Sequence, residues 1–352
     1  MITLSGFGYE ESLTSPYNAF TETWKRKSFI SGPSVKEFED RFKHFVGAED
    51  CVAVSSCTSA LQLSLLALSI GPGDEVITVP YTWVSTVEAI VQVGAKPVFV
   101  DINPDDLCIG TKTLGNAITP NTKAIIPVDL FGNVADIDEL KKYQLPIIQD
   151  SAQSVGAKYK GKRVGSLSDL TCFSFYPTKN LGSWGDAGAV TGSKTYCAKI
   201  RELRNHGQSK KFDIKTIGWN ARMDSIQAEV LTNKLPLLDQ HNKRRREIAQ
   251  SYDAELKDTV TIPVQNKNSM HVYHQYVVQS TKAIQLQKAL HENGIQSRNY
   301  YPVPLNQLPP YYTNQKFPHS QHAGAYGLAI PVHQYLTNDE VKFIIKTIKD
   351  SI

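Results

Sequence analysis

Short apolar runs alternate with amphipathic segments from about residue 51 onwards. Residues 51–56 read CVAVSS, which is typical of a buried strand, and residues 58–70 carry apolar side chains at helical spacing. Further strands are predicted in the segments 71–80, 96–102, 123–132, 145–153, 170–177 and 188–192, and further helices in 84–94 and 136–144. Apolar strands that alternate with helices predict an α/β fold, with a mainly parallel sheet covered on both faces.

The pattern changes after about residue 220. Residues 224–258 form one long helical pattern that we expect to bend near Pro236, because proline interrupts the hydrogen bonds of a helix. The elements predicted beyond it are a strand at 273–280, a helix at 283–294 and a Pro/Tyr-rich loop at 299–312. We therefore predict a large α/β domain at 1–240 and a smaller α+β domain at 241–352. Residues 1–30 are expected to pack across the domains or against a second subunit.

Composition narrows the class of protein. The 352 residues are 20% charged and 41% hydrophobic, which is ordinary for a globular protein, and the net charge of +4 suits anionic ligands without requiring nucleic acid. The N-terminus lacks a basic start and an apolar run, and no stretch approaches the ~18 apolar residues of a membrane span. Five scattered cysteines indicate reduced thiols in a cytoplasmic protein, and no metal-ligand spacing occurs.

Ligands of open α/β sheets bind beyond the carboxyl ends of the strands, and several candidate residues fall there. The turn at residues 56–59 (Ser56, Cys57, Thr58 and Ser59) begins a predicted helix, whose free N–H groups could bind phosphate. Asp150 follows a second strand, although an isolated Asp is often only a helix cap. Trp83 follows a third strand, although tryptophan is more often part of the core.

Lys179 lies in the segment SFYPTKNLGSWGDAG, between an apolar strand and a glycine-rich turn. Most lysines are surface charges, but desolvation lowers the pKa of a lysine and makes its amine a nucleophile. Taken together, these residues suit a ligand with a phosphate, a flat ring, a ring nitrogen and an aldehyde. That ligand is pyridoxal 5′-phosphate (PLP), which proteins hold with a lysine Schiff base and a carboxylate at the ring nitrogen.

The sequence also resembles the DegT/DnrJ/EryC1/StrS sugar aminotransferases over nearly its whole length. The most specific segments are GPGDEVITVPYTWVSTVEAIVQVGAKPVFVDI, QDSAQSVGA, GSLSDLTCFSFYPTKNLGSWGDAGAV and LRNHG followed by GWNARMDSIQAEVL. The resemblance implies a PLP enzyme of fold type I, with a mainly parallel seven-stranded sheet between helices and a smaller C-terminal α+β domain. It also implies a homodimer whose active sites lie at the subunit interface.

The resemblance assigns roles to individual residues. Lys179 matches the lysine that forms the Schiff base with PLP and moves the proton between carbon atoms. Asp150 matches the carboxylate that keeps the ring nitrogen protonated, Gln153 matches a hydrogen-bond partner of the ring hydroxyl, and Trp83 matches the aromatic residue stacked on the ring. The remaining cofactor positions are Cys57, Thr58 and Ser174 at the phosphate, and Asn220, which reaches the phosphate from the partner subunit.

The implied reaction transfers an amino group from L-glutamate to a nucleotide-diphosphate-linked keto sugar, in two half-reactions. Relatives with His in place of Lys179 remove a sugar hydroxyl instead, so lysine favours amination. The segments around Lys179 and at 273–305 look most like members that aminate C3 of the sugar. Amination at C4, a dehydratase, and a non-catalytic member that senses a sugar nucleotide are the alternatives.

Some positions depart from the family pattern or are candidates for substrate contacts. Where members that aminate C3 often read His-Tyr-Pro, this chain has Tyr300 and Tyr301 before Pro302. Cys57 replaces a common glycine, and Gln149 replaces a common glutamate. The other candidate substrate residues are His206, Arg222 and Arg298. The basic run NKRRRE at 242–247 is interpreted as a solvated helix face, with contact to a nucleotide diphosphate as the alternative.

Overall fold

The computed structural model describes residues 1–6 and 16–352. Its helices are α1 (Pro16–Arg26), α2 (Pro33–Val46), α3 (Cys57–Ala67), α4 (Ser85–Gln92), α5 (Thr111–Leu114), α6 (Ile137–Lys141), α7 (Lys194–Leu203), α8 (Ser225–Lys234), α9 (Leu238–Leu256), α10 (Ala283–Glu292), α11 (Pro318–Tyr326) and α12 (Asn338–Ser351). Short 3₁₀ turns add η1 (Gly115–Ala117), η2 (Leu130–Gly132), η3 (Leu235–Leu237), η4 (Leu305–Gln307) and η5 (Pro309–Tyr311). Residues 7–15 lie outside the described part, so the expectation for residues 1–30 falls partly there.

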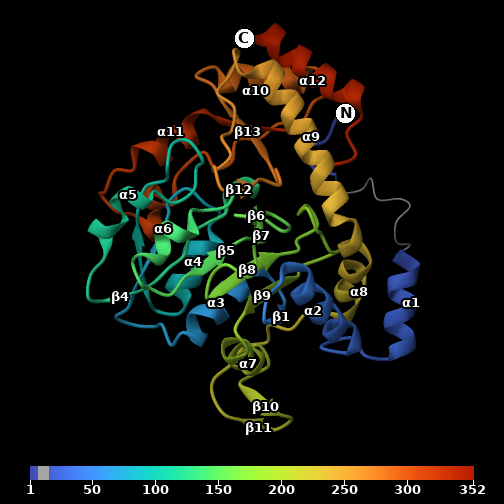
Figure 1. Cartoon of the computed structure of the whole chain (residues 1–352), viewed down its shortest axis with the longest axis vertical. Coiled ribbons are helices and arrows are strands. Elements are labelled where there is room, and N and C mark those ends of the chain that lie inside the picture. Colours follow the sequence, from blue (N-terminus) through green and yellow to red (C-terminus); the bar gives the residue numbers. More distant parts are fainter. Residues whose placement is uncertain (7–15) are drawn as a thin grey trace.

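The strands form two main sheets at the centre of the molecule (Figure 1). The strands of these sheets are β1 (Asp50–Val54), β2 (Glu75–Thr78), β3 (Lys96–Phe99), β4 (Thr122–Ile125), β5 (Ile148–Asp150), β8 (Leu170–Ser174) and β9 (Gly188–Gly192). β3, β2 and β4 are parallel neighbours, as are β5 and β8, whereas β9 runs antiparallel between β8 and β1. Isolated parallel bridges from Ile125 to Ile147 and from Val128 to Asp150 join the two sheets.

The strands β1, β2, β5, β8 and β9 bury both of their faces, as the apolar runs predict, whereas the edge strand β3 is partly exposed. In β1, Cys51 and Ala53 belong to one hydrophobic core, while Val52 and Val54 belong to a second core. Side chains alternate across a strand, so the two cores lie on opposite faces of the sheet. The first core is aromatic and includes Phe42 of α2, and the second includes the apolar helix α3. The prediction of an α/β chain is therefore confirmed.

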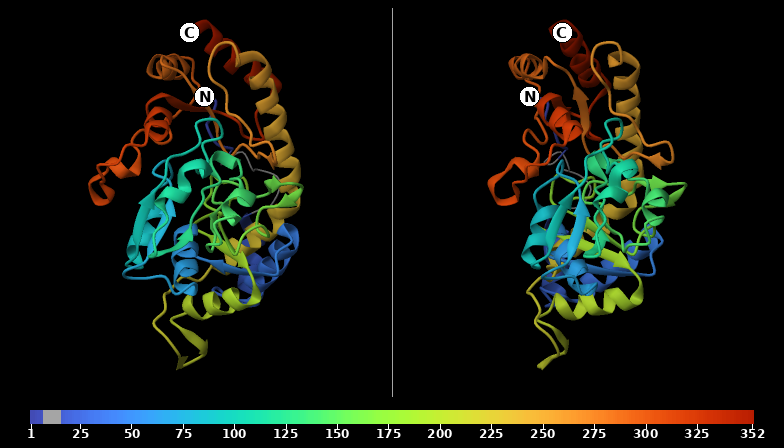
Figure 2. Two further views of the ribbon diagram at one scale, coloured as in Figure 1. Left: turned by 60° about the vertical axis from the view of Figure 1, so that its left-hand side comes forward. Right: turned by 90° about the vertical axis from the view of Figure 1, so that its left-hand side faces the viewer.

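The long helical pattern at 224–258 is interrupted by Pro236, as predicted. α8 ends at Lys234, the 3₁₀ turn η3 contains the proline, and α9 continues from Leu238 to Leu256. α9 therefore crosses residue 240 and runs towards the C-terminal end of the molecule (Figures 1 and 2). There it packs into a third hydrophobic core with α10, α12 and the antiparallel pair β13 (Tyr276–Gln279) and β14 (Gly327–Ile330).

Two small antiparallel sheets complete the described chain. β6 (Lys158–Tyr159) pairs with β7 (Lys162–Arg163) and with β12 (Ser269–Met270), so a strand from beyond residue 240 joins the hairpin. The hairpin of β10 (Gln208–Lys210) and β11 (Asp213–Ile214) projects from the end of the molecule opposite the C-terminus in all three views (Figures 1 and 2). Its side chains Phe212 and Ile214 are exposed.

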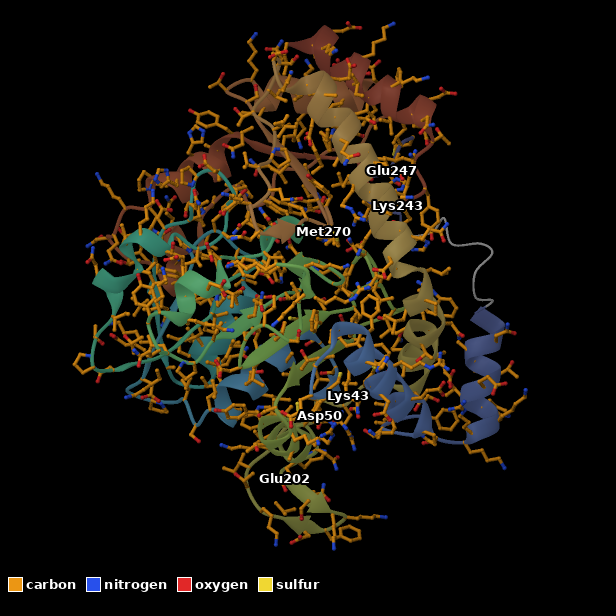
Figure 3. The ribbon with its side chains drawn as sticks, in the orientation of Figure 1. Lys43, Asp50, Glu202, Lys243, Glu247 and Met270 are labelled. Carbon is orange, nitrogen blue, oxygen red and sulfur yellow. The ribbon has the colours of Figure 1, made fainter. Side chains whose placement is uncertain are left out.

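The basic run at 242–247 is not a uniformly solvated face. Lys243 lies one helical turn from Glu247 on the outer side of α9 (Figure 3), at 4.0 Å. Arg244 instead donates to the carbonyl oxygen of Leu336 at 2.8 Å, and Arg245 is buried and donates to the carbonyl oxygen of Tyr273 at 3.2 Å. Part of the run therefore ties α9 to the C-terminal segment, because a long helix buries one side only.

The aromatic core provides a test of this packing. Phe42 is fully buried, and its ring centroid lies 5.0 Å from that of Phe173 and 5.2 Å from that of Phe175. We expect Phe42→Ala to lower the free energy of unfolding by about 3–5 kcal/mol, because it leaves a cavity among these rings. Phe343→Ala removes a partly exposed ring from α12 and should cost less than about 1 kcal/mol. Urea unfolding curves compare the two, and equal losses would contradict the packing described.

Candidate active site

The carboxyl ends of β1, β2, β5 and β8 lie at one edge of the sheets and border a cavity of about 460 Å³. Loops that follow these strands contribute most of its wall, and a loop from the C-terminal region closes another side. Of the residues singled out in the sequence, the cavity is lined by Ser56, Cys57, Thr58, Trp83, Asp150, Gln153, Ser174, Lys179, Tyr300 and Tyr301. The tertiary structure therefore brings together residues that are far apart in the sequence.

Lys179 lies in the tight turn after β8, where its backbone N–H donates to the carbonyl oxygen of Tyr176 at 2.8 Å. Its side chain is partly exposed and lines the cavity. Burial lowers the pKa of Lys179 below its ordinary value of 10.5, while Cys57 and Asp150 act in the opposite direction. A lowered pKa leaves more of the amine neutral at a given pH, and the neutral amine is the form that a lysine nucleophile requires.

Asn180 fixes the turn that carries Lys179. Its Nδ2 donates to Oδ1 of Asn242 at 2.8 Å and to the carbonyl oxygen of Val272 at 3.0 Å. Its Oδ1 lies 3.2 Å from Nδ1 of His274, another residue of the cavity wall. The partners come from α9 and from the segment before β13. The reactive lysine is thus anchored to the C-terminal part of the chain by a buried amide.

Asp150 ends β5 and is almost completely buried. Oδ2 accepts a hydrogen bond from Thr86 Oγ1 at 2.8 Å, and Oδ1 accepts from the N–H of Ala152 at 3.2 Å. Burial raises the pKa of Asp150, and these hydrogen bonds oppose the rise. All of these donors are neutral, so the carboxylate can accept a further, positively charged donor from the cavity. A protonated ring nitrogen is such a donor, which is the first indication that PLP fits.

A second buried carboxylate, Asp129, lies behind Asp150. Its Oδ2 accepts from Gln149 Nε2 at 2.7 Å and from Ser151 Oγ at 2.6 Å, and its Oδ1 accepts from the N–H of Ala135 at 3.0 Å. Burial raises the pKa of Asp129 to about 7, and the neighbouring Asp150 adds to the rise. The sequence analysis missed Asp129 and treated Gln149 as a minor departure from the family pattern. In the structure the Gln149 amide is a partner of this carboxylate.

Aromatic rings line the opposite wall of the cavity. Trp83 is 58% exposed, and its ring centroid lies 5.9 Å from that of Tyr301. Trp83 is therefore not a core residue, and its ring can stack on a flat ligand. Both polar atoms of the Gln153 side-chain amide are hydrogen-bonded. Oε1 accepts from the N–H of Phe131 at 2.7 Å, and Nε2 donates to the Tyr301 hydroxyl at 3.1 Å.

The first turn of α3 forms the end of the cavity that suits a phosphate. Ser56 is the N-cap, and its Oγ accepts from the N–H of Ser59 at 3.1 Å. The N–H groups of Cys57 and Thr58 belong to the first turn, which has no acceptor within the helix. Ser174, at the end of β8, lines the same cavity. Oriented N–H groups and hydroxyls at a helix N-terminus fit an anion such as the phosphate of PLP.

The other predicted residues lie outside the lining of this cavity. Asn220 is exposed, and its Oδ1 accepts from Arg222 Nε at 3.1 Å. His206 lies beside this pair, since its N–H donates to the carbonyl oxygen of Trp219. Arg298 is exposed, with its guanidinium 5.9 Å from the centre of the Tyr300 ring.

The structure adds residues that sequence reasoning missed. The further lining residues are Leu61, Thr82, Ser85, Val128, Phe131, Ala152, Tyr176, Thr178, Asp186, His274 and Gln275. Ser85 lies two residues after Trp83, so its position after a predicted strand could have identified it. His274 and Gln275 lie beyond residue 240 and before β13, where no local pattern signals a site.

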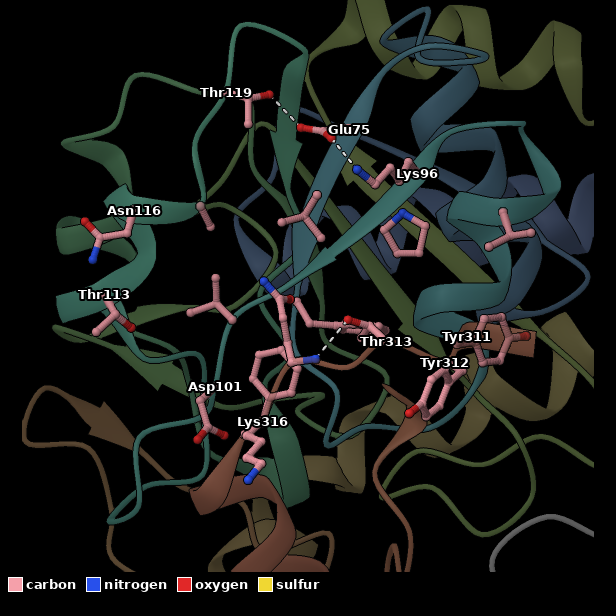
Figure 4. A pocket seen from close by; sticks show the side chains of 18 of the residues that line it. Glu75, Lys96, Asp101, Thr113, Asn116, Thr119, Tyr311, Tyr312, Thr313 and Lys316 are labelled. Atoms are coloured by element: carbon pink, nitrogen blue, oxygen red, sulfur yellow. Dashed lines mark hydrogen bonds and ion pairs between the residues drawn. The ribbon is translucent and has the colours of Figure 1, made fainter. Parts of the chain in front are cut away.

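A second cavity of about 880 Å³ lies beside the edge strand β3. Figure 4 shows the ion pair between Lys96 and Glu75, and the hydrogen bond from Thr119 to Glu75, on one side of it. Tyr311, Tyr312 and Lys316 contribute the other side. None of the predicted catalytic or cofactor residues lines this larger cavity. We therefore place the chemistry in the smaller cavity, where Lys179 and Asp150 meet.

Two further observations concern the residues that the structure describes. Residues 1–6 and 16–352 hold no group of three His, Cys, Asp or Glu side chains that could bind a metal ion. In the same part of the chain, no helix has both the length and the apolar character needed to cross a membrane.

The fold and the cavity that holds Lys179 and Asp150 define a class of protein. Comparison with known sequences gives the name of that class. The chain belongs to the DegT/DnrJ/EryC1/StrS aminotransferase family, whose model matches residues 14–349.

Individual relatives agree with this assignment. The UDP-2-acetamido-2-deoxy-3-oxo-D-glucuronate aminotransferase of Pseudomonas aeruginosa is 41% identical over 323 residues, which is 90% of each chain. The structure of DesV from S. venezuelae, solved with a ketimine intermediate, has a TM-score of 0.94 and 34% identity over 97% of this chain and 95% of its own. A Streptococcus pneumoniae protein solved in its PLP form has a TM-score of 0.92 and 28% identity over 99% of this chain and 97% of its own.

The raised pKa of Asp129 predicts a pH dependence of stability. Between about pH 4 and pH 7 the folded protein keeps a proton on Asp129 that the unfolded chain has lost, so stability falls as the pH rises. Asparagine does not titrate. The stability of Asp129→Asn relative to that of the wild type should therefore increase as the pH rises, by at most about 1.4 kcal/mol per pH unit.

Urea unfolding at about pH 5 and pH 7 measures this difference. Asp258→Asn makes the same chemical change on the protein surface and is the matched control. A constant difference in stability between Asp129→Asn and the wild type at both pH values would contradict the prediction.

Proposed function

We propose that this protein is a PLP-dependent aminotransferase that moves an amino group from L-glutamate to a nucleotide-diphosphate-linked keto sugar. The observation that carries the proposal is the position of Lys179, whose pKa is lowered by burial, in one cavity with the buried carboxylate of Asp150. Two relatives support it by name, since one is an aminotransferase of a UDP-linked 3-oxo sugar and another is solved in a PLP form.

The residues of the cavity suit PLP at each of its polar groups. Lys179 would hold the aldehyde carbon, Asp150 would accept the hydrogen bond of the ring nitrogen, and Gln153 would meet the ring hydroxyl. The first turn of α3, at Cys57 and Thr58, would bind the phosphate together with Ser174, while Trp83 would stack on the ring. When bound, PLP supplies an electron sink for the carbon atom that loses its proton.

The chain's own residues perform the proton transfer. Because burial lowers the pKa of Lys179, more of its amine is neutral at a given pH, and the neutral amine can take a proton from one carbon atom and return it to another. Asn180 keeps the amine in place through Asn242 and Val272. Thr86 orients the Asp150 carboxylate and reduces the cost of keeping it charged in a buried position.

The acceptor is proposed to be a 3-keto sugar. Tyr300 and Tyr301 line the cavity, and the sugar would lie beside them. Amination at C4 and dehydration remain the alternatives, and lysine at position 179 disfavours the dehydratase. A non-catalytic sugar-binding member is disfavoured because a binding module needs neither a lysine with a lowered pKa nor a carboxylate at a ring nitrogen.

The proposal includes a homodimer with shared active sites. Asn220, Arg222 and His206 would serve the site of the partner subunit, because they lie outside the cavity of their own chain. Exposed apolar side chains support such an interface, and they are Phe20, Trp24, Phe29, Ile30, Phe212, Ile214 and Ile217. Surface patches of this kind mark protein contacts.

Two features of the architecture and the location in the cell remain proposals. The bridges between β4 and β5 support one continuous seven-stranded sheet. The third hydrophobic core, formed by residues from α9 onwards, supports a C-terminal domain at about 241–352. A cytoplasmic location is supported only by the composition of the sequence.

Replacement of the lysine tests the proposed chemistry. Lys179→Ala should abolish the absorbance of PLP attached to the protein through lysine, and should lower turnover by about 10³-fold or more, because the proton carrier is lost. Spectral titration with L-glutamate and then with keto-sugar nucleotides separates the two half-reactions. Lys199→Ala, which removes a lysine of α7, is the matched control and should behave as the wild type. Normal turnover of Lys179→Ala would exclude the mechanism.

Complementation between subunits tests the shared site. Lys179→Ala and Asn220→Ala should each be poorly active alone, and a mixture refolded together should recover up to about a quarter of the wild-type activity. Half of the dimers are then mixed, and one of the two sites in each mixed dimer is intact. If the mixture is no more active than the sum of the two variants, Asn220 does not act across a dimer interface.

A further inference from the structure

Asp129 lies directly behind the strand end that carries Asp150. It is fully buried, and its backbone N–H donates to the carbonyl oxygen of Asp150 at 2.9 Å. The preceding residue, Val128, forms a parallel bridge with Asp150. Asp129 itself is outside the lining of the cavity that holds Lys179. Any contact with a bound ligand must therefore be made by the residues that Asp129 holds.

The Asp129 carboxylate holds both chain neighbours of Asp150. Its Oδ2 accepts from Gln149 Nε2 at 2.7 Å and from Ser151 Oγ at 2.6 Å. Side chains alternate across a strand, so Gln149 and Ser151 point to the face opposite to that of Asp150. The Asp150 side chain lines the cavity on its own face. One buried carboxylate therefore fixes the residue from behind and leaves its cavity side free for a ligand.

The end of β5 needs such support. β5 has only three residues, and its ladder with β8 ends at the pair of Asp150 and Cys172. The ends of elements and the loops beyond them open more easily than their centres do. Ser151 is the first residue past the strand, and Asp129 ties it to Gln149 across the last strand residue. This link restrains the position in which Asp150 is presented to the cavity.

We propose that Asp129 is a positioning residue that sets the geometry of Asp150 towards the PLP ring. The inference rests on the proposed function, since Asp150 needs a ring nitrogen to meet, and it goes beyond it by giving a residue outside the cavity a role in cofactor binding. A side chain that binds a ligand must be held close to its productive position, and the residues behind it supply that restraint. Loss of the Asp129 carboxylate should therefore weaken the contact made by Asp150 without removing any group from the cavity.

The test is a double-mutant cycle on the binding of PLP to the full-length protein freed of cofactor. The absorbance of lysine-bound PLP during titration gives Kd for the wild type, Asp129→Ala, Asp150→Asn and the double variant. We expect the Kd of Asp129→Ala to rise about tenfold, which is the scale of a weakened hydrogen bond to a charged group. In the Asp150→Asn background the same change should alter Kd less than about twofold, because no charged contact is left to position.

The conservative variant Asp129→Asn separates position from charge. Asparagine keeps an oxygen that can accept from Gln149 and Ser151, so its Kd should stay within about threefold of the wild-type value. If Asp129→Asn loses as much affinity as Asp129→Ala, the charge of Asp129 matters and its positioning role is refuted.

Asp106→Ala is the matched control, because Asp106 is a partly buried carboxylate that accepts from the N–H of Cys108 at 3.0 Å, away from β5 and the cavity. It should lower the melting temperature without changing Kd. Ser151→Ala removes one of the two bonds to Oδ2 and should raise Kd about threefold, so it decides the question if Asp129→Ala does not fold.

The remaining outcomes separate the inference from the proposed function. An unchanged Kd for folded Asp129→Ala, or an equal loss of affinity in the Asp150→Asn background, would overturn the inference and leave the proposed function standing. A wild type that binds no PLP would refute the proposed function and the inference with it.

Discussion

The molecule depends on one constraint, which is that parallel strands covered on both faces end at a single edge. β5 ends in Asp150 and β8 leads into the turn of Lys179, so an acid and a base meet in one cavity. Neither group would be chemically useful in water, where the lysine is protonated and the carboxylate is solvated. Burial at the sheet edge lowers the pKa of the lysine, which favours its neutral amine, whereas it raises the pKa of the aspartate, a rise that the hydrogen bond from Thr86 opposes.

Neutral hydrogen bonds hold this pair in place. Thr86 orients Asp150, and Asn180 ties the Lys179 turn to α9 and to the segment before β13. Behind them, Asp129 forms a buried network with Gln149 and Ser151. These contacts join the central sheet to the C-terminal part of the chain. Catalysis and the packing of the two parts are therefore linked through the same few buried polar groups.

Much of the fold could be predicted because buried strands and helices leave a periodic pattern in the sequence. The break at Pro236 and the strand before Asp150 were predictable for the same local reasons. The small sheet of β6, β7 and β12 was not predicted, because it pairs segments that are distant in the chain. Gln275 and Asp129 were missed because a single glutamine or aspartate carries no pattern, and its role depends on which partners the fold supplies.

By itself, the sequence determined the α/β class, the position of Lys179 and Asp150 after strands, and membership of an aminotransferase family through the order and spacing of its segments. Only the tertiary structure decided which of these residues share a cavity. It placed Trp83 at the cavity wall instead of in the core, and it placed Asn220 and Arg222 outside the site of their own chain. The physical reason is that local pattern reflects burial and hydrogen bonding along the chain, whereas a pKa or a buried hydrogen-bond network depends on neighbours that only folding brings together.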